Sequence, residues 1–199
     1  GVVAIMGTGS NSCLYENGEI DMCDLTESTL NTIMGNPDHK FYDYLVEKPA
    51  TQYAFPFHIN FQKNNEDGTP DVNYNKAIAN TAFRQSIYYG LDFTTYYQRT
   101  NAINPMSCEN DCYTMKGLIY TTDGIDYTQL VRDELGLPAY NGETPVRLNA
   151  EKKEALKAQA IEELTAIGVT FPVEFDYYIS GSNQTALDTA NVLAQAFSN

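Results

Sequence analysis

Apolar residues recur at helical spacing along much of the chain. In residues 80–92, the side chains of Phe83, Ile87 and Leu91 recur every four positions, so they share one face of a helix. Asn80 can accept hydrogen bonds from the free N–H groups of a first turn, which predicts that the helix begins there. The pattern indicates an amphipathic helix packed against a hydrophobic core.

Further helices are predicted from the same periodicity and from residues suited to their ends. Asn149 and Gly168 flank the longest of these, since Asn caps a first turn and Gly favours the conformation that follows a last turn. The predicted helices cover residues 11–17, 26–34, 80–99, 127–135, 151–167 and 185–197.

Short apolar or alternating stretches between the helices predict β-strands. Pro56 has no N–H group to donate, so the strand that contains it is expected at a sheet edge or at a bulge. Near the N-terminus, a strand, a loop, a short helix and a second strand follow one another as a βαβ-like unit. The predicted strands cover residues 2–6, 20–25, 52–60 and 169–179, and residues 42–46 are expected to be extended.

Length and charge narrow the possible functions. The chain has 199 residues, 43% of them hydrophobic, and can bury one good core or two small ones. Its net charge of −14, without any run of Lys or Arg, disfavours nucleic acid as a partner. No apolar stretch reaches transmembrane length, and residues 1–6 are too short for a signal peptide. We expect either a cytosolic protein or a mature or excised piece of an exported one.

Four cysteines, Cys13, Cys23, Cys108 and Cys112, allow three disulfide pairings. We favour Cys108 with Cys112, because the polar residues between them could form a turn that closes a small loop. Cys13 with Cys23 would then join a helix to the following strand. Disulfides would place the protein outside the cytoplasm. Zinc is the alternative, but it needs four converging ligands, and the chain has one closely spaced Cys pair.

The loop Gly7-Thr8-Gly9-Ser10 follows the first predicted strand and is similar to a nucleotide-contact loop of sugar kinases with the actin-like fold. It lacks the Lys of a Walker A loop. Ser12 stands where the Rossmann fingerprint has its third Gly. A sugar-kinase-like nucleotide-binding fragment is therefore the alternative function.

No residue pattern points to catalysis. A nucleophile needs a neighbouring base, and the two histidines, His39 and His58, lie in a polar loop and on an aromatic strand. The chain has no Gly-x-Ser-x-Gly elbow, and no pair of carboxylates stands out by its spacing. We predict that the chain is not an enzyme and uses no cofactor or metal.

Two stretches resemble signature segments of the extracellular solute-binding proteins that serve oligopeptide ABC transporters. One is Phe83-Arg-Gln-Ser-Ile87 followed by Leu91-Asp92, where the family reads roughly Val-Arg-Gln-Ala-Leu-x-x-Ala-Leu-Asp. The other is Leu14-Tyr-Glu-Asn-Gly-Glu-Ile-Asp21, where the family often has Leu-x-x-Gly-Glu-Ile-Asp. Ile59-Asn-Phe-Gln62 also fits the phrase that ends an aromatic strand in that family.

The resemblance covers nearly the whole chain and implies a fold and a function. It implies an α/β fold in which residues 1–199 form one lobe, the second, of a two-lobed periplasmic-binding-protein (Venus flytrap) structure, incomplete at its C-terminal end. The implied function is the substrate-binding component of a peptide importer, which captures oligopeptides between its lobes and delivers them to membrane permease subunits. Such a protein is lipid-anchored at the extracellular face of a bacterial membrane, or is periplasmic.

The chain departs from this family in two respects. The family's first lobe is absent, and so is its Trp-x-Ala-Asp motif, whose Asp receives the N-terminal ammonium of the peptide; the chain contains no Trp. We therefore expect an excised fragment that needs the first lobe of the same polypeptide as a partner. By itself it is expected to bind peptide weakly or not at all.

The resemblance also predicts ligand-binding residues on one strand and two loops. Tyr and amide side chains suit this role, because they join apolar surface to hydrogen-bonding groups. Each residue equally has a structural interpretation, as core for Tyr53, a satisfied strand residue for His58, a turn cap for Asn60 and solvated turns for the loops. The predicted residues are Tyr53, His58 and Asn60 on the cleft strand, Ser182 and Asn183 on one loop, and Ser10 and Asn11 on the other.

Overall fold

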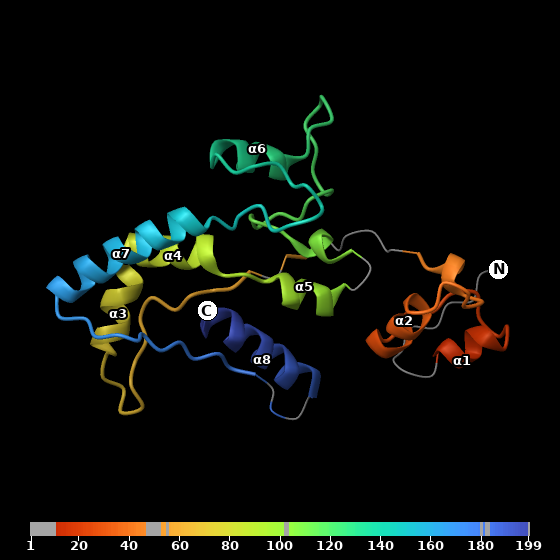
Figure 1. Cartoon of the computed structure of the whole chain (residues 1–199), viewed down its shortest axis with the longest axis horizontal. Helices are drawn as coiled ribbons and strands as arrows, with labels where there is room; N and C mark the ends of the chain where they lie inside the picture. The colour runs from red at the N-terminus through yellow and green to blue at the C-terminus, as the bar shows by residue number, and fades with distance from the viewer. Residues whose placement is uncertain are drawn as a thin grey trace.

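The computed structural model describes residues 11–46, 53–54, 56–101, 104–179, 181 and 184–198. The regular elements within these residues are helical (Figure 1). In chain order they are α1 (Asn11–Glu16), α2 (Glu27–Met34), the 3-10 helix η1 (Tyr42–Tyr44), α3 (Val72–Ala79), α4 (Thr81–Gly90), α5 (Thr94–Thr100), the 3-10 helix η2 (Pro105–Cys108), α6 (Tyr127–Glu134), α7 (Ala150–Ala166) and α8 (Gln184–Ser198).

Helices are found in each of the ranges predicted from periodicity, and Asn80 and Asn149 cap two of them as expected, while Thr26 caps α2. Side-chain oxygens at these caps accept from N–H groups of the first turn, as the capping rule requires. Because these bonds satisfy donors that have no partner inside the helix, they fix where each helix begins. The three bonds run from Thr29 N to Thr26 Oγ1 at 3.3 Å, from Phe83 N to Asn80 Oδ1 at 2.8 Å and from Lys152 N to Asn149 Oδ1 at 3.0 Å.

The helix predicted over 80–99 is in fact two helices, because the helical conformation is interrupted between Gly90 and Thr94. The carboxylate of Asp92 accepts a hydrogen bond from the backbone N of Thr94 at 2.8 Å. Such a local side-chain bond competes with continuation of the helix and begins a new one instead. Asp92 of the signature segment therefore has a structural role at the start of α5.

The hydrophobic core lies where α3, α4 and α7 meet. Of the described elements, α4 and α7 have the most extensive contact, and Figure 1 shows α7 lying along α4. Small residues at the contact let the two helices approach closely. The buried cluster consists of Ala77, Ala82, Ala160, Leu164 and Val169, with Phe83, Leu156 and Val173 packed against it.

Residues 104–148 form an arm that carries α6 and projects from the α4–α7 pair (Figure 1). The end of the arm returns to the end of α4. Arg147 donates to the carbonyl oxygens of Tyr88 and Leu91, and the backbone N of Asn149 donates to the carbonyl of Tyr89 at 3.0 Å. These bonds satisfy the last carbonyls of α4, which have no partner within the helix.

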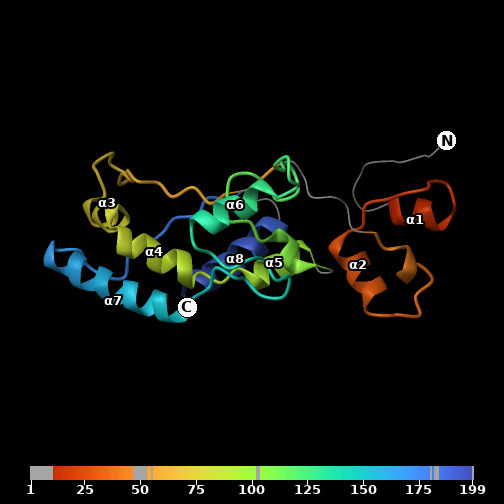
Figure 2. The same cartoon turned by 90° about the horizontal axis from the view of Figure 1, so that it is seen from above.

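Residues 11–46 form a smaller region, which Figures 1 and 2 place to one side of the larger body. Its own contacts join α1 to the residues after α2. The rings of Tyr15 and Phe41 meet at 5.3 Å, and Lys40 pairs with Glu16 at 3.3 Å. Within the described residues, no helix is both long enough and apolar enough to cross a membrane.

The predicted sheet is not found in the described residues, whose pairing is limited to isolated bridges such as Asn64 with Pro70 and Tyr120 with Asp126. Residues 42–46, which were expected to be extended, form η1 over 42–44 instead. The predicted strand 20–25 carries a bridge position at Met22, and the strand predicted in the same βαβ-like unit, residues 2–6, lies outside the described residues. The stretches 56–60 and 173–179 have no helix or strand assignment and follow an extended course in Figure 1, and no backbone hydrogen bond joins either of them to another described segment. The described chain is thus helix-rich, and the α/β assignment is not confirmed.

None of the four cysteines forms a disulfide, so neither predicted disulfide is present. The thiol of Cys112, in the favoured pair Cys108–Cys112, is engaged in a hydrogen bond. Its Sγ donates to the carbonyl oxygen of Thr114 at 3.0 Å, within its own turn.

Candidate functional site

The segment that follows α7, residues 173–179, has the side-chain alternation of a β-strand, and we call it the edge segment. It is part of the blue trace between α7 and α8 in Figure 1. Successive side chains of an extended chain point to opposite faces, and here one face packs on the body while the other meets solvent. The half-buried side chains are Val173, Phe175 and Ile179, and the exposed ones between them are Glu174, Asp176, Tyr177 and Tyr178.

Among the described residues, no strand lies beside the edge segment. None of the backbone hydrogen bonds within the described residues joins it to another segment, and the same holds for residues 56–60. The two stretches meet through side chains, since the rings of Phe57 and Tyr177 lie 6.3 Å apart. An unpaired strand edge presents a row of N–H and C=O groups that can pair with another chain.

Aromatic rings hold the edge segment against the helices. Phe57 stacks on Phe93, at the start of α5, with a centroid separation of 5.1 Å. Phe175 contacts rings from three helices, which fixes the inner face of the segment and leaves its backbone edge open. These rings are Tyr74 of α3 at 5.5 Å, Phe83 of α4 at 6.3 Å and Phe197 of α8 at 5.6 Å.

Carboxylates dominate the charges of the edge segment. Asp176 pairs with Lys63 at 2.7 Å, and the same ammonium lies 3.6 Å from Asp71. The hydrogen bond with Asp176 raises the pKa of the Lys63 ammonium, which therefore stays charged at neutral pH. The exposed carboxylate of Glu174 forms no hydrogen bond or ion pair with the other described residues.

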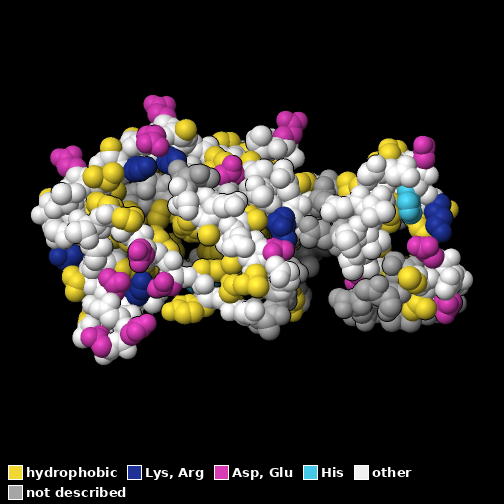
Figure 3. All heavy atoms as spheres, turned by 60° about the horizontal axis from the view of Figure 1, so that its bottom comes forward, with side chains coloured by type: hydrophobic (Ala, Val, Ile, Leu, Met, Phe, Trp, Pro, Cys, Tyr) yellow, Lys and Arg dark blue, Asp and Glu magenta, His cyan; other side chains and the backbone are white. Residues whose placement is uncertain are grey.

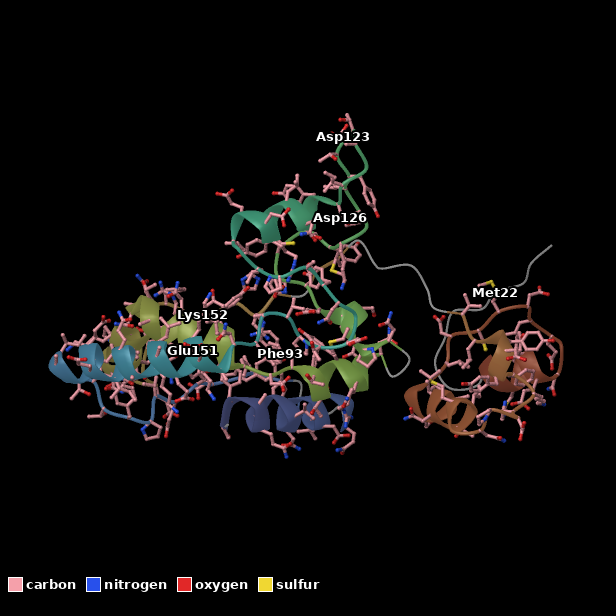
Figure 4. The ribbon with its side chains drawn as sticks, turned by 45° about the horizontal axis from the view of Figure 1, so that its top comes forward. Met22, Phe93, Asp123, Asp126, Glu151 and Lys152 are labelled. Carbon is pink, nitrogen blue, oxygen red and sulfur yellow. The ribbon has the colours of Figure 1, made fainter. Side chains whose placement is uncertain are left out.

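A pocket of about 170 Å³ lies between α5 and α8. Its lining includes apolar Phe93 and Leu193 and the charged residues Asp92 and Lys153. Figure 4 shows Phe93 in the region between α7 and α8. Because Phe93 also stacks on Phe57, the pocket adjoins the aromatic rings of the edge segment. Its size is similar to that of a cavity of about 150 Å³ that holds a benzene ring.

Two of the predicted ligand-binding residues, His58 and Asn60, lie on the stretch 56–60 that meets the edge segment, and Tyr53 precedes that stretch. The three are exposed, and the 63% exposure of Tyr53 excludes its interpretation as a core residue. Asn60 Oδ1 accepts a hydrogen bond from the backbone N of Gln62 at 2.9 Å, which supports its interpretation as a turn cap.

The other predicted positions are not brought to this site by the described residues. Ser10, Ser182, Asn183 and the whole Gly7–Ser10 loop lie outside them, and Asn11 begins α1 in the smaller region.

Sequence reasoning overlooked the residues of the edge segment itself. Glu174 and Tyr178 alternate with apolar residues in a stretch predicted as a strand. That period of two was the available signal, because it separates an inner from an outer face. No sequence pattern predicts the stacking of Phe57 on Phe93, since this contact depends on how the helices pack.

A buried charge cluster in the arm was also not predicted. Arg132 and Glu109 are each 1% exposed. Arg132 binds the carboxylate of Asp111 and the carbonyl oxygen of Pro138, and Glu109 accepts from the backbone N of Val146 at 2.9 Å. Burial raises the pKa of the Glu109 carboxyl. Buried groups with shifted pKa values are typical of active sites, but these are paired inside the arm and closed to a substrate. We interpret the cluster as structural.

Comparison of the chain with protein-family models, with curated proteins and with solved structures found no match. Across the residues that the structure describes, no group of three His, Cys, Asp or Glu side chains is placed to hold a metal ion. Function is therefore inferred from the edge segment and its surroundings, together with the motif resemblance.

Proposed function

We propose that this chain is the peptide-binding part of a solute-binding protein that serves an oligopeptide importer. The observation that carries the proposal is the unpaired backbone edge of residues 173–179, held in an extended conformation by aromatic packing. The signature segments around Arg84 and Gly18 support the same family.

An extended peptide would bind by adding a strand to this edge. Main-chain hydrogen bonds supply affinity that does not depend on sequence, and pockets receive alternate side chains of the bound strand. Exposed rings such as Tyr178 and Phe57 offer apolar contact, and the pocket beside Phe93 can receive one side chain. No bond is made or broken, so the protein acts by capture and release.

The setting of this activity follows from the resemblance. We propose that a first lobe covers the bound peptide, and that permease subunits receive it at the extracellular face of a bacterial membrane or in the periplasm. Affinity of the chain alone is expected to be weak, near the millimolar range that corresponds to about −4 kcal/mol, because one lobe covers half of the ligand.

The absence of Trp from the chain provides a direct assay. A short peptide with a single Trp is titrated with the protein, and indole fluorescence is followed by selective excitation. We expect saturable binding that is lost when alternate backbone nitrogens of the same peptide are methylated, because methylation removes N–H donors and keeps the side chains. Equal binding of both peptides would contradict strand addition.

A matched pair of variants locates the site. Tyr178, on the edge segment, is 91% exposed, and Tyr113, on the arm, is 80% exposed. Tyr178→Ala should weaken peptide binding several-fold, while Tyr113→Ala should leave it unchanged. The same loss in both variants would refute the edge segment as the binding site.

A further inference from the structure

The outer face of the edge segment carries a distinct chemical pattern. Alternation places Glu174, Asp176 and Tyr178 together on it, so an added strand meets two carboxylates and then a phenol ring. Side chains directly opposite in paired strands interact, and opposite charges are favourable there while like charges are unfavourable. This face therefore discriminates between ligands by charge.

The carboxylates near the edge segment outnumber the cations that could neutralise them. Asp176 shares Lys63 with Asp71, whereas Glu174 has no cation among the described residues. Arg84 is committed elsewhere, since it donates to the carbonyl oxygens that end α3, at 2.7 and 2.9 Å. A ligand cation placed opposite Glu174 would thus meet an uncompensated charge.

The loop before α3 extends the acidic surface. Glu66 and Asp67 are exposed there, and hydrogen bonds from Thr69 lower the pKa of Asp67, so it stays ionised in mild acid. Figure 3 shows acidic side chains beside hydrophobic ones on one face of the larger body. The net charge of −14 adds a longer-range attraction for cations.

Tyr178 adds a second means of binding a cation. Its ring is 91% exposed and contacts no other ring among the described residues. A Lys or Arg side chain over such a ring gains from cation–π attraction. An aromatic or aliphatic ligand residue would instead pack on the rings of Phe57 and Tyr177, which lie 6.3 Å apart.

We infer that the edge segment selects cationic peptides, in which Lys or Arg alternates with aromatic or aliphatic residues. The inference rests on the proposed function, because it specifies the ligand of the same site. The occupant is an extended peptide whose basic side chains face Glu174 and Tyr178 and whose apolar side chains face the aromatic rings.

Three peptides of equal length test the inference. Each carries one Trp reporter and the same apolar residues, and they differ only in having Lys, Gln or Glu at the alternating positions. We expect the Lys peptide to bind best and the Glu peptide worst, with dissociation constants differing about tenfold from two or more cross-strand charge pairs. The difference should shrink as salt is raised, since exposed charges are screened.

Two carboxylate variants distinguish local selection from general attraction. Glu174→Gln should reduce the ratio between the Lys and Glu peptides about two- to fivefold. Glu134→Gln, at an exposed position at the end of α6, removes the same charge from the chain and should leave the ratio unchanged. Equal effects of the two variants would overturn selection by the edge segment.

The outcomes separate the two proposals. The titrations extend well above the millimolar dissociation constant expected for the chain alone. If none of the three peptides binds over that range, strand addition to residues 173–179 is refuted, and with it the proposed function. If all three bind with equal affinity, or the Glu peptide binds best, peptide binding stands and selection of cationic peptides is refuted.

Discussion

Replacing the buried Arg132 with Met should destabilise the molecule more than replacing an exposed Arg with Met. The side chain of Arg132 is 1% exposed and lies in the arm, and its guanidinium binds Asp111 and the carbonyl oxygen of Pro138. The same group lies 3.7 Å from the centre of the Tyr140 ring. Met has a similar length and packs in the same space, but it supplies neither charge nor donor.

The magnitude follows from what the substitution leaves behind. Hydrogen bonds to charged groups contribute about 1.5–3 kcal/mol each, offset in part by the cost of burying the charge. Removing one partner of a buried ion pair destabilises by about 3–5 kcal/mol, because the remaining charge is uncompensated. Asp111 is itself 5% exposed, but Arg147 Nε lies 3.8 Å away and compensates it in part. We therefore expect a loss near 3 kcal/mol, at the lower end of the range.

Urea denaturation followed by far-ultraviolet circular dichroism measures this loss, since the described chain is mainly helical. A lower midpoint with an unchanged slope reports a change in stability. Arg99→Met is the matched control. The ion pair of Arg99 with Asp188 is 3.5 Å long, with side chains 34% and 40% exposed, and its loss should cost less than about 1 kcal/mol.

Equal and small losses in the two variants would refute the reasoning, because they would mean that the buried pair contributes no more than an exposed one. If Arg132→Met fails to fold, Arg132→Lys provides the measurement. Lys keeps the charge but not the planar fork of donors, so it should fold with a smaller loss than Met. A Lys variant as unstable as the Met variant would show that geometry rather than charge is decisive.

Three further predictions concern packing, pH and thiols. A Cβ on Gly90 would lie 2.7 Å from side-chain carbons of Lys153, so Gly90→Ala should not raise the melting temperature by itself, but should add up to about 1 kcal/mol of helix stability in a Lys153→Ala background. Burial raises the pKa of Glu109, so its contribution to stability is present below the ordinary carboxyl pKa and lost as pH rises through the raised value; Glu109→Gln should lack this loss in urea titrations over about pH 4–7. Alkylation without reductant should add four groups, as measured by intact mass. Cys13 is exposed and should react first, and Cys112 should react more slowly because burial raises the pKa of its thiol. Two additions or none would support the predicted disulfides.

Helices could be predicted well because their signals are local. The caps at Asn80 and Asn149 and the apolar spacing between them are set within a few residues. α3 was not predicted, although its buried residues Tyr74, Ala77 and Ile78 have helical spacing, because it is eight residues long and follows a polar loop.

The strands could not be predicted correctly because a strand depends on its neighbour. Residues 173–179 have the alternation of a strand and are extended, yet no described segment pairs with them. Alternation reports which face is buried and says nothing of a partner at the edge. The candidate site was missed for a related reason, since its rings come from α3, α4, α5 and α8, which are far apart in sequence.

The stretch that holds α5 and the arm leaves and rejoins the α4–α7 pair at one place, since the backbone N of Asn149 donates to the carbonyl oxygen of Tyr89 at 3.0 Å. This geometry has a consequence for folding and divergence. The two core helices can meet only after residues 91–149 close into a loop, so this closure should limit the folding rate more than helix formation does. The equilibrium cost of closure grows slowly, by about 0.6 kcal/mol for each doubling of loop length. Relatives of this chain could therefore lengthen, shorten or exchange the arm while keeping the same helix pair.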